Sequence, residues 1–181
     1  MSKAVLISIR PKWCQKIASD EKTIEVRKTR PKLETPFKCY IYCTLPKYPH
    51  EDFIATDYPM PQFYGGGKVI GEFTCERIVP ITYDGGRLWC PTNAAFSPAT
   101  CLSQAEIIAY IGDKGRCYGW HISDLRIYDT PRELSEFRRA TDPCDSCHAE
   151  YTWECTDCKK FGGNIKRPPQ SWCYVEAMKN D

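Results

Sequence analysis

Short apolar segments with strand-like alternation dominate this chain of 181 residues. In KCYIYCTL, Cys39, Ile41, Cys43 and Leu45 fall on one face of an extended strand, because strand side chains point alternately to the two faces. Similar segments are AVLISIR, KTIEVRK, KVIGEFTCERIVPI, GWHISDLRIYDTP and SWCYVE. Five or six strands with few helices predict an α+β fold, built on a mostly antiparallel sheet that closes as a small β-barrel with flanking helices.

Two segments predict the longer helices, and PRELSEF predicts a short one. PKWCQKIASDE begins with Pro11, and proline suits the first turn of a helix. LSQAEIIAYIG carries Ser103 with Glu106 three residues later, the pattern of a capping box, and Gly112 provides a stop.

The last strand-like segment, Trp172–Glu176, is separated from the others by residues 141–167, a cysteine-rich tract without a helix or strand period. Pro168 and Pro169 would stiffen the chain as it returns. We therefore expect residues 1–181 to form a single domain in which the tract is an insert before the last barrel strand. Truncation at Thr141 should then unfold the domain.

The insert contains CDSCHAEYTWECTDC, a C-x2-C-x7-C-x2-C pattern formed by Cys144, Cys147, Cys155 and Cys158. Two such knuckles can direct four thiolates at one Zn²⁺, and His148 could replace one cysteine. Four sulfur ligands leave no position for water, so the predicted zinc is structural. Metal binding would also order a tract that has few apolar residues. The alternatives are two disulfides or four unligated thiols.

The remaining cysteines, including Cys14, Cys75, Cys101 and Cys117, are expected to act as small hydrophobic residues. No apolar run approaches the 18 or so residues of a membrane span, and the N-terminus lacks the pattern of a secretory signal. We expect a cytoplasmic protein with reduced thiols.

Basic residues gather near the N-terminus. The net charge is +2, which excludes a strongly basic nucleic-acid binder, but residues 1–32 carry nine Lys and Arg against three acids. Such a segment either forms a surface for an anionic ligand or is an ordinary solvated face.

DEKTIEVRKTRPK places Lys22, Glu25, Arg27, Lys28 and Arg30 within nine positions. Glu25 and Arg27 share one face of their predicted strand, and Lys22 lies at its entrance. A lysine near a glutamate can form a proton-transfer pair if burial shifts its pKa, and arginine suits phosphate or carboxylate recognition. The alternative is an exposed strand with interleaved charges.

The segment ISIRPKWCQKIASDEKTIEVRKTRP resembles the N-terminal signature of the ASCH domain, a relative of the PUA domains that bind RNA. The family pattern is G-x-K-x(4)-R at the end of the first helix, and Lys22 and Arg27 match it. Asp20 replaces the glycine, and aspartate can adopt the left-handed conformation of a helix stop.

GKVIGEFTCERI and YGWHISDLRIYDTPRELSEF also resemble the family. The resemblance is strongest to a bacterial and prophage branch, which often ends in a cysteine-bearing insert followed by residues like RPPQSWCYVE.

This resemblance implies a PUA-like barrel whose cleft, beside the first helix and the Lys/Arg strand, faces RNA or a nucleotide-sized ligand. Some members hydrolyse N4-acylated cytidine, and others are nucleases on single-stranded RNA. In the amidohydrolases a lysine and a threonine are catalytic, and here Glu25 stands at the position of that threonine. Lys22 and Glu25 are therefore the catalytic candidates, and Glu25 could serve as a base but not as a hydroxyl nucleophile.

Three functions follow as hypotheses, and whether the protein is an enzyme stays open. The first is a module that binds RNA or a modified nucleotide through Lys22, Arg27, Lys28 and Arg30. The second is a hydrolase of the same fold, and the third is a prophage-encoded protein-interaction module. Trp120 could stack on a base near the cleft or belong to the core, and His121 points to the opposite face.

Overall fold

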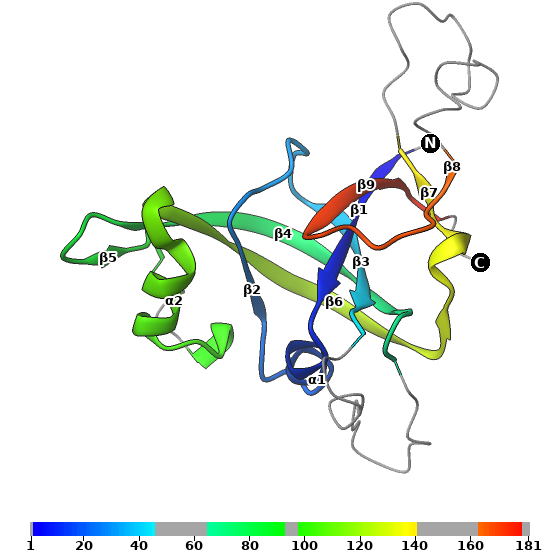
Figure 1. Cartoon of the computed structure of the whole chain (residues 1–181), viewed down its shortest axis with the longest axis horizontal. Coiled ribbons are helices and arrows are strands. Elements are labelled where there is room, and N and C mark those ends of the chain that lie inside the picture. The colour runs from blue at the N-terminus through cyan, green and yellow to red at the C-terminus, as the bar shows by residue number, and fades with distance from the viewer. Residues whose placement is uncertain (1, 46–64, 93–97, 141–162, 179–181) are drawn as a thin grey trace, which may run out of the picture.

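The structure is a computed structural model that describes residues 2–45, 65–92, 98–140 and 163–178. In these ranges nine strands form one sheet in the order β2-β6-β4-β3-β1-β9-β7-β8, with β5 added beside β4 (Figure 1). The strands are β1 Lys3–Ile9, β2 Ile24–Arg27, β3 Phe37–Cys43, β4 Val69–Tyr83, β5 Leu88–Trp89, β6 Arg116–Arg132, β7 Arg138–Arg139, β8 Gly163–Asn164 and β9 Trp172–Glu176. The helices are α1 Pro11–Ala18 and α2 Gln104–Ile111, and the 3-10 turns are η3 Pro98–Thr100, η4 Gly112–Lys114 and η5 Leu134–Glu136.

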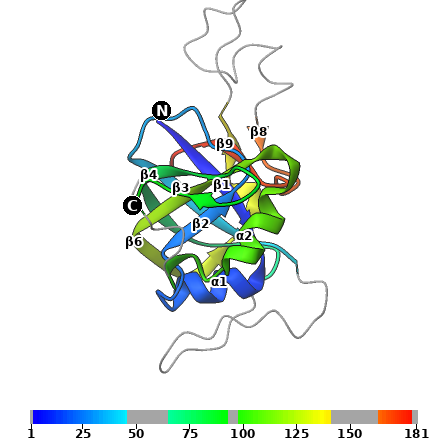
Figure 2. The same cartoon turned by 90° about the vertical axis from the view of Figure 1, so that its left-hand side faces the viewer.

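The sheet is mostly antiparallel, as predicted, and β1 with β3 is its parallel pair. Register shifts along β4 and β6 let these two long strands bend (Figure 2). As a result β2, at one edge of the sheet, comes back to β1 and β9. Arg27 Nη2 donates a 2.6 Å hydrogen bond to the Ser8 carbonyl, and Trp172 Nε1 donates a 3.0 Å bond to Thr29 Oγ1. The sheet thus closes through side chains into a PUA-like barrel.

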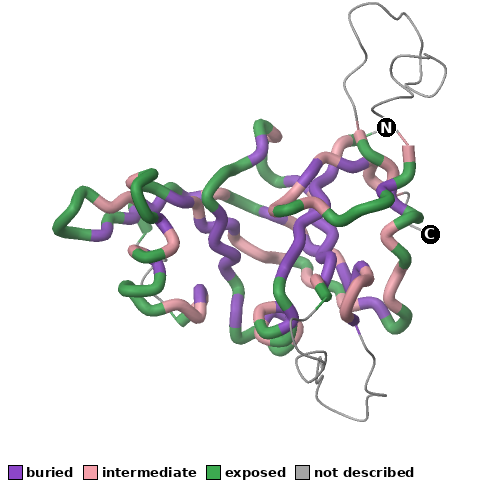
Figure 3. Tube along the Cα trace, in the orientation of Figure 1, coloured by how far each residue is buried: buried purple, intermediate pink, exposed green. Residues whose placement is uncertain are grey.

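Both faces of β1 and β3 are buried, which gives the molecule its purple centre in Figure 3. One face of β3 places Cys39, Ile41 and Cys43 in the main core, and its other face places Tyr40 and Tyr42 in a second cluster. The prediction for Leu45 is wrong, because β3 ends at Cys43 and the Leu45 side chain is 71% exposed.

The buried cysteines behave as small hydrophobic residues. Burial raises the pKa of Cys75 and of Cys117 to about 12, so both thiols stay neutral. Cys14 is also fully buried, whereas Cys101 is only half-buried and does not fit this prediction.

Helix α2 packs against residues of β4, β5 and β6 in a third cluster of buried residues, separate from the main core. The capping box is present: the Ser103 hydroxyl accepts from the Glu106 backbone N–H, and the Glu106 carboxylate accepts from the Ser103 N–H. Ile107 and Ile111 bury their side chains with Leu88 and other residues of the third cluster. No helix in the described ranges has the length and apolar character needed to cross a membrane.

The segment Trp172–Glu176 completes the sheet, as expected, by pairing antiparallel with β1 from Lys3 opposite Glu176 to Ile7 opposite Trp172. Residues 141–162 of the predicted insert lie outside the described residues. The sheet resumes at β8, before the predicted end of the insert at residue 167. Ile165 is buried, and its N–H donates to the Phe137 carbonyl at 2.8 Å.

Candidate functional site

A cleft of about 940 Å³ lies over the edge strand β2. Its walls come from the end of β1, the start of α1, the turn after α2 and the returning segment 168–171. The lining residues are Ser8, Ile9, Arg10, Trp13, Lys22, Glu25, Val26, Arg27, Lys28, Thr29, Thr44, Leu102, Tyr110, Lys114, Pro168, Pro169, Gln170 and Ser171.

Lys22 follows the end of α1 and lies at the floor of this cleft. Asp20 has a φ of +57°, the left-handed conformation that the sequence predicts for a helix stop at this position. The chain then turns back, and the Lys22 N–H donates to the Lys16 carbonyl at 2.9 Å. A 2.9 Å bond from the Thr23 N–H to the Ala99 carbonyl ties the entrance of β2 to η3.

The Lys22 side chain is buried, with 2% of its surface exposed. Its Nζ donates to the Thr100 carbonyl at 2.6 Å and lies 3.5 Å from Glu25 Oε2. The ammonium also lies 5.1 Å from the centre of the Trp13 ring. Burial lowers the pKa of Lys22, and the positive charge of Arg27 acts in the same direction, while the Glu25 carboxylate opposes both.

Arg27 lies on the other side of Glu25. Its Nε forms an ion pair with Glu25 Oε1 at 3.0 Å, although this nitrogen lacks the geometry of a hydrogen bond. Lys22, Glu25 and Arg27 therefore form a buried ionic triad in which one carboxylate lies between two cations. Glu25 and Arg27 meet because they are two residues apart on one face of β2.

The Arg27 guanidinium also forms hydrogen bonds with β1 and with the returning segment 168–171. Besides the Ser8 carbonyl, it reaches Ser171 Oγ at 3.5 Å. Ser8 in turn donates its hydroxyl to the Pro169 carbonyl at 2.6 Å and its N–H to the Ser171 carbonyl at 2.9 Å. No motif marks Ser8, Pro169 or Ser171 as site residues, yet these contacts make segment 168–171 a wall of the cleft.

Exposed cations surround the triad. Arg10, Lys28 and Lys114 line the cleft and are exposed, and Lys28 Nζ lies 5.2 Å from the centre of the Tyr110 ring. Burial raises the pKa of Tyr110, so its hydroxyl stays protonated. Among the described lining residues, five side chains are basic, and Glu25 carries the one carboxylate. The cleft is therefore suited to an anionic ligand.

Four of the residues expected at the site come together here: Lys22, Glu25, Arg27 and Lys28. Arg30 is exposed after β2 and is not among the residues that line the cleft.

Trp120 belongs to the core, the alternative to base stacking. Its side chain is completely buried, with ring centres 6.0 Å from Phe37 and 6.1 Å from Trp172. Stacking on a base would require an accessible ring. His121, on β6 opposite Ile24, also lies outside the cleft lining.

The predicted zinc ligands Cys144, Cys147, Cys155 and Cys158, with the alternative ligand His148, lie outside the described residues. In the part of the chain that the structure describes, no group of three or more His, Cys, Asp or Glu side chains is arranged to hold a metal ion.

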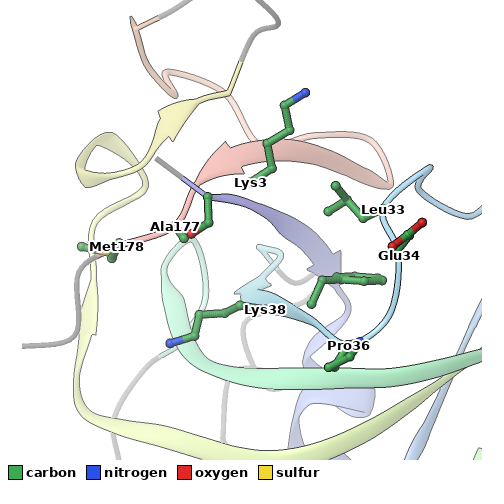
Figure 4. A pocket seen from close by; sticks show the side chains of 9 residues that line it. Lys3, Leu33, Glu34, Pro36, Lys38, Ala177 and Met178 are labelled. Atoms are coloured by element: carbon green, nitrogen blue, oxygen red, sulfur yellow. The ribbon is translucent and has the colours of Figure 1, made fainter. Parts of the chain in front are cut away.

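A smaller cavity, of about 420 Å³, lies beside the N-terminal end of β1 (Figure 4). Lys3, Leu33 and Glu34 contribute to its lining, together with Lys38, whose Nζ forms an ion pair with Glu72 at 2.9 Å. None of the residues expected at the functional site contributes to it.

The sequence matches no protein-family model and no curated protein. The structure is similar to that of ASCH from Zymomonas mobilis, with a TM-score of 0.57 and 18% identity over 96% of this chain and 87% of that chain. Two point mutants of the Zymomonas mobilis protein give the same TM-score, at 18% and 17% identity. These alignments cover 97% and 96% of this chain and 91% and 88% of the mutant chains. The likeness shows that the two proteins share the α+β, PUA-like barrel fold.

Proposed function

We propose that the protein binds RNA or a modified nucleotide in the cleft over β2. The observation that carries this proposal is the buried ionic triad of Lys22, Glu25 and Arg27 beneath a rim of exposed cations. The cleft volume of about 940 Å³ is at the upper end of the range of about 300–1,000 Å³ that is usual for small-ligand sites.

The rim and the floor suit different parts of a nucleotide. Arg10, Lys28 and Lys114 would contact phosphate groups, because guanidinium and ammonium groups neutralise phosphate charge. On the floor, the Glu25 carboxylate can accept a hydrogen bond from a base amino group, and Trp13 provides an aromatic surface.

The test is binding of a labelled single-stranded RNA, followed by fluorescence anisotropy as salt is raised. The rim variant Arg10→Gln/Lys28→Gln should weaken binding and reduce the salt slope by about one for each phosphate that the protein no longer neutralises. The single variants Arg10→Gln and Lys28→Gln are compared with Lys32→Gln, which also removes one positive charge but from an exposed residue outside the cleft lining. Binding by the rim variant equal to that of wild type would refute the cleft assignment.

A hydrolase of the same fold is the second candidate, favoured by the 3.5 Å approach of Lys22 Nζ to Glu25 and by the lowered pKa of Lys22. A lysine whose pKa is lowered transfers a proton more readily near neutral pH, and Glu25 would act as a base. The substrates to test are N4-acylated cytidine and single-stranded RNA.

Lys22→Arg separates the two candidates, since arginine keeps the charge but does not give up its proton. We expect loss of turnover with binding retained if Lys22 transfers a proton. Failure of the intact protein to convert either substrate would exclude the hydrolase, and unchanged turnover by Lys22→Arg would exclude proton transfer by this residue.

We also propose structural zinc at Cys144, Cys147, Cys155 and Cys158, on the basis of their spacing. The cysteines, or His148 in place of one of them, would hold the ion, which would supply ordering free energy to the insert.

A further inference from the structure

The hairpin formed by β4 and β5 carries an exposed aromatic side chain that the cleft does not use. Trp89, in β5, is 55% exposed, and with Leu45 it forms the pair of large hydrophobic residues exposed in the described part of the chain. Tryptophan is usually well buried, and an exposed ring on a strand is available to stack on a base.

The strand register links Trp89 to the cleft. Trp89 lies opposite Thr82, and Thr82 lies opposite Arg116. Residues directly opposite in antiparallel strands share a face, as do residues two apart in one strand. Arg116 therefore shares its face with Tyr118, which lies opposite Arg27 of the triad.

Helix α2 covers the reverse face of this hairpin. Leu88, the neighbour of Trp89, is buried in the cluster that contains Ile107 and Ile111. On the other face, Pro80, Arg116 and Trp89 are exposed. Figure 1 shows the hairpin projecting beyond β2, and Figure 3 shows the exposed residues near its tip. We call the surface of Pro80, Thr82, Trp89 and Arg116 the open face.

Positive charge follows the same path. Arg116 and Arg87 are exposed near Trp89, and Lys114, two residues before Arg116, lines the cleft. Asp84 in the hairpin turn uses its Oδ1 to accept the N–H groups of Gly86 at 3.0 Å and Arg87 at 2.8 Å. Exposed basic side chains are therefore present both at the cleft and near the Trp89 ring.

We propose that the open face is a second subsite for single-stranded RNA, on which one base stacks on Trp89 while Arg116 and Arg87 contact phosphates. This inference rests on the proposed function and narrows it from a nucleotide to an oligonucleotide. Trp89 and Arg27 are separated by three strand spacings across the sheet and two residues along it, which corresponds to about 16 Å between their backbone positions. One nucleotide in the cleft does not span that separation, whereas a strand of several nucleotides does.

The experiment compares a dinucleotide with a single strand of about eight nucleotides, a length within the usual site sizes for such proteins. We expect the longer strand to bind wild type more tightly. Trp89→Ala should weaken binding of the longer strand about 5- to 150-fold, the range that corresponds to stacking of one base on an aromatic side chain, and should leave binding of the dinucleotide unchanged. Trp89→Phe should retain most of the affinity, and Arg116→Gln should reduce the salt slope for the longer strand by about one.

Leu45→Ala is the control, because it shortens the other large exposed hydrophobic residue, which lies outside the open face. Equal binding of both lengths to wild type, or unchanged binding of the longer strand to Trp89→Ala, would overturn the second subsite and leave the cleft in place. If neither oligonucleotide binds wild type, the proposed function fails and this inference fails with it.

Discussion

Replacement of Glu25 by glutamine tests whether the triad is a buried ionic cluster that depends on one carboxylate. The side chain of Glu25 is 8% exposed, and it contacts Lys22 at 3.5 Å and Arg27 at 3.0 Å. Glutamine has nearly the same shape as glutamate, so Glu25→Gln removes the negative charge with little change in packing. The buried cations Lys22 and Arg27 then have no anion between them.

The magnitude follows from the cost of an uncompensated buried charge. Removing one partner of a buried ion pair costs about 3–5 kcal/mol. For a protein of this size, each 1 kcal/mol lowers the Tm by about 2–4 °C, so we expect a fall of about 6–20 °C at neutral pH. The amide oxygen can still accept from Lys22, which favours the lower part of that range.

The pH dependence gives a second signature. The pKa of Lys22 is already lowered by burial in the wild type, and loss of the Glu25 charge lowers it further. Between the folded and unfolded pKa values of Lys22 the unfolded chain binds more protons, so stability rises with pH in that window. The deficit of Glu25→Gln should therefore shrink between neutral pH and pH 10, provided that both proteins unfold reversibly.

Thermal and urea unfolding monitored by circular dichroism would measure these changes. Glu21→Gln is the matched control, since Glu21 is an exposed carboxylate that pairs with Lys16 at 2.7 Å, and it should leave the Tm nearly unchanged. If Glu25→Gln unfolds like the Glu21→Gln control, the triad contributes no more than a surface ion pair and the argument from burial is refuted.

Three further predictions concern Arg27, the last strand and the cysteine tract. Arg27→Lys keeps the charge but loses the fork that reaches the Ser8 carbonyl, and should cost about 1–3 kcal/mol in urea unfolding; unchanged stability would contradict the role of that bond. A chain that ends at Thr141 lacks β9, the antiparallel partner of β1, and should show no cooperative unfolding transition; a cooperative melt would show that β9 is dispensable. Protein prepared without added metal should contain about one zinc per chain by elemental analysis, and Cys144→Ser/Cys147→Ser should contain much less; a folded, metal-free wild type would exclude structural zinc.

The main strands could be predicted because their residues alternate and their ends carry proline or glycine. Cys39, Ile41 and Cys43 lie on one buried face as the period requires, and the Ser103 capping box starts α2 where expected. The two-residue strands β5, β7 and β8 could not be predicted, since two residues show no period. Leu45 continues the alternation in the sequence, but it follows the end of β3, so its side chain does not belong to a face of the sheet.

The charged residues on the floor of the cleft could also be predicted from the sequence, because Lys22, Glu25 and Arg27 lie within six positions. The hydrogen-bond partners of Lys22 and Arg27 could not be predicted. Lys22 and Arg27 donate to the backbone carbonyls of Thr100 and Ser8, and any residue type carries a carbonyl. Their choice depends on which distant segments the sheet brings to the edge of β2.

The contacts of Ser8 with Pro169 and Ser171 also determine when the cleft can exist during synthesis. Residues 8 to 28 supply its floor and much of its rim, but Pro168, Pro169, Gln170 and Ser171 supply one wall. While these residues are still inside the ribosome, the nascent chain already contains Arg27. The Ser171 hydroxyl, which accepts a hydrogen bond from Arg27 in the finished fold, is not yet in place. The complete cleft, with all its walls, is therefore a property of the finished fold, and the basic N-terminal segment does not carry it while translation is still under way.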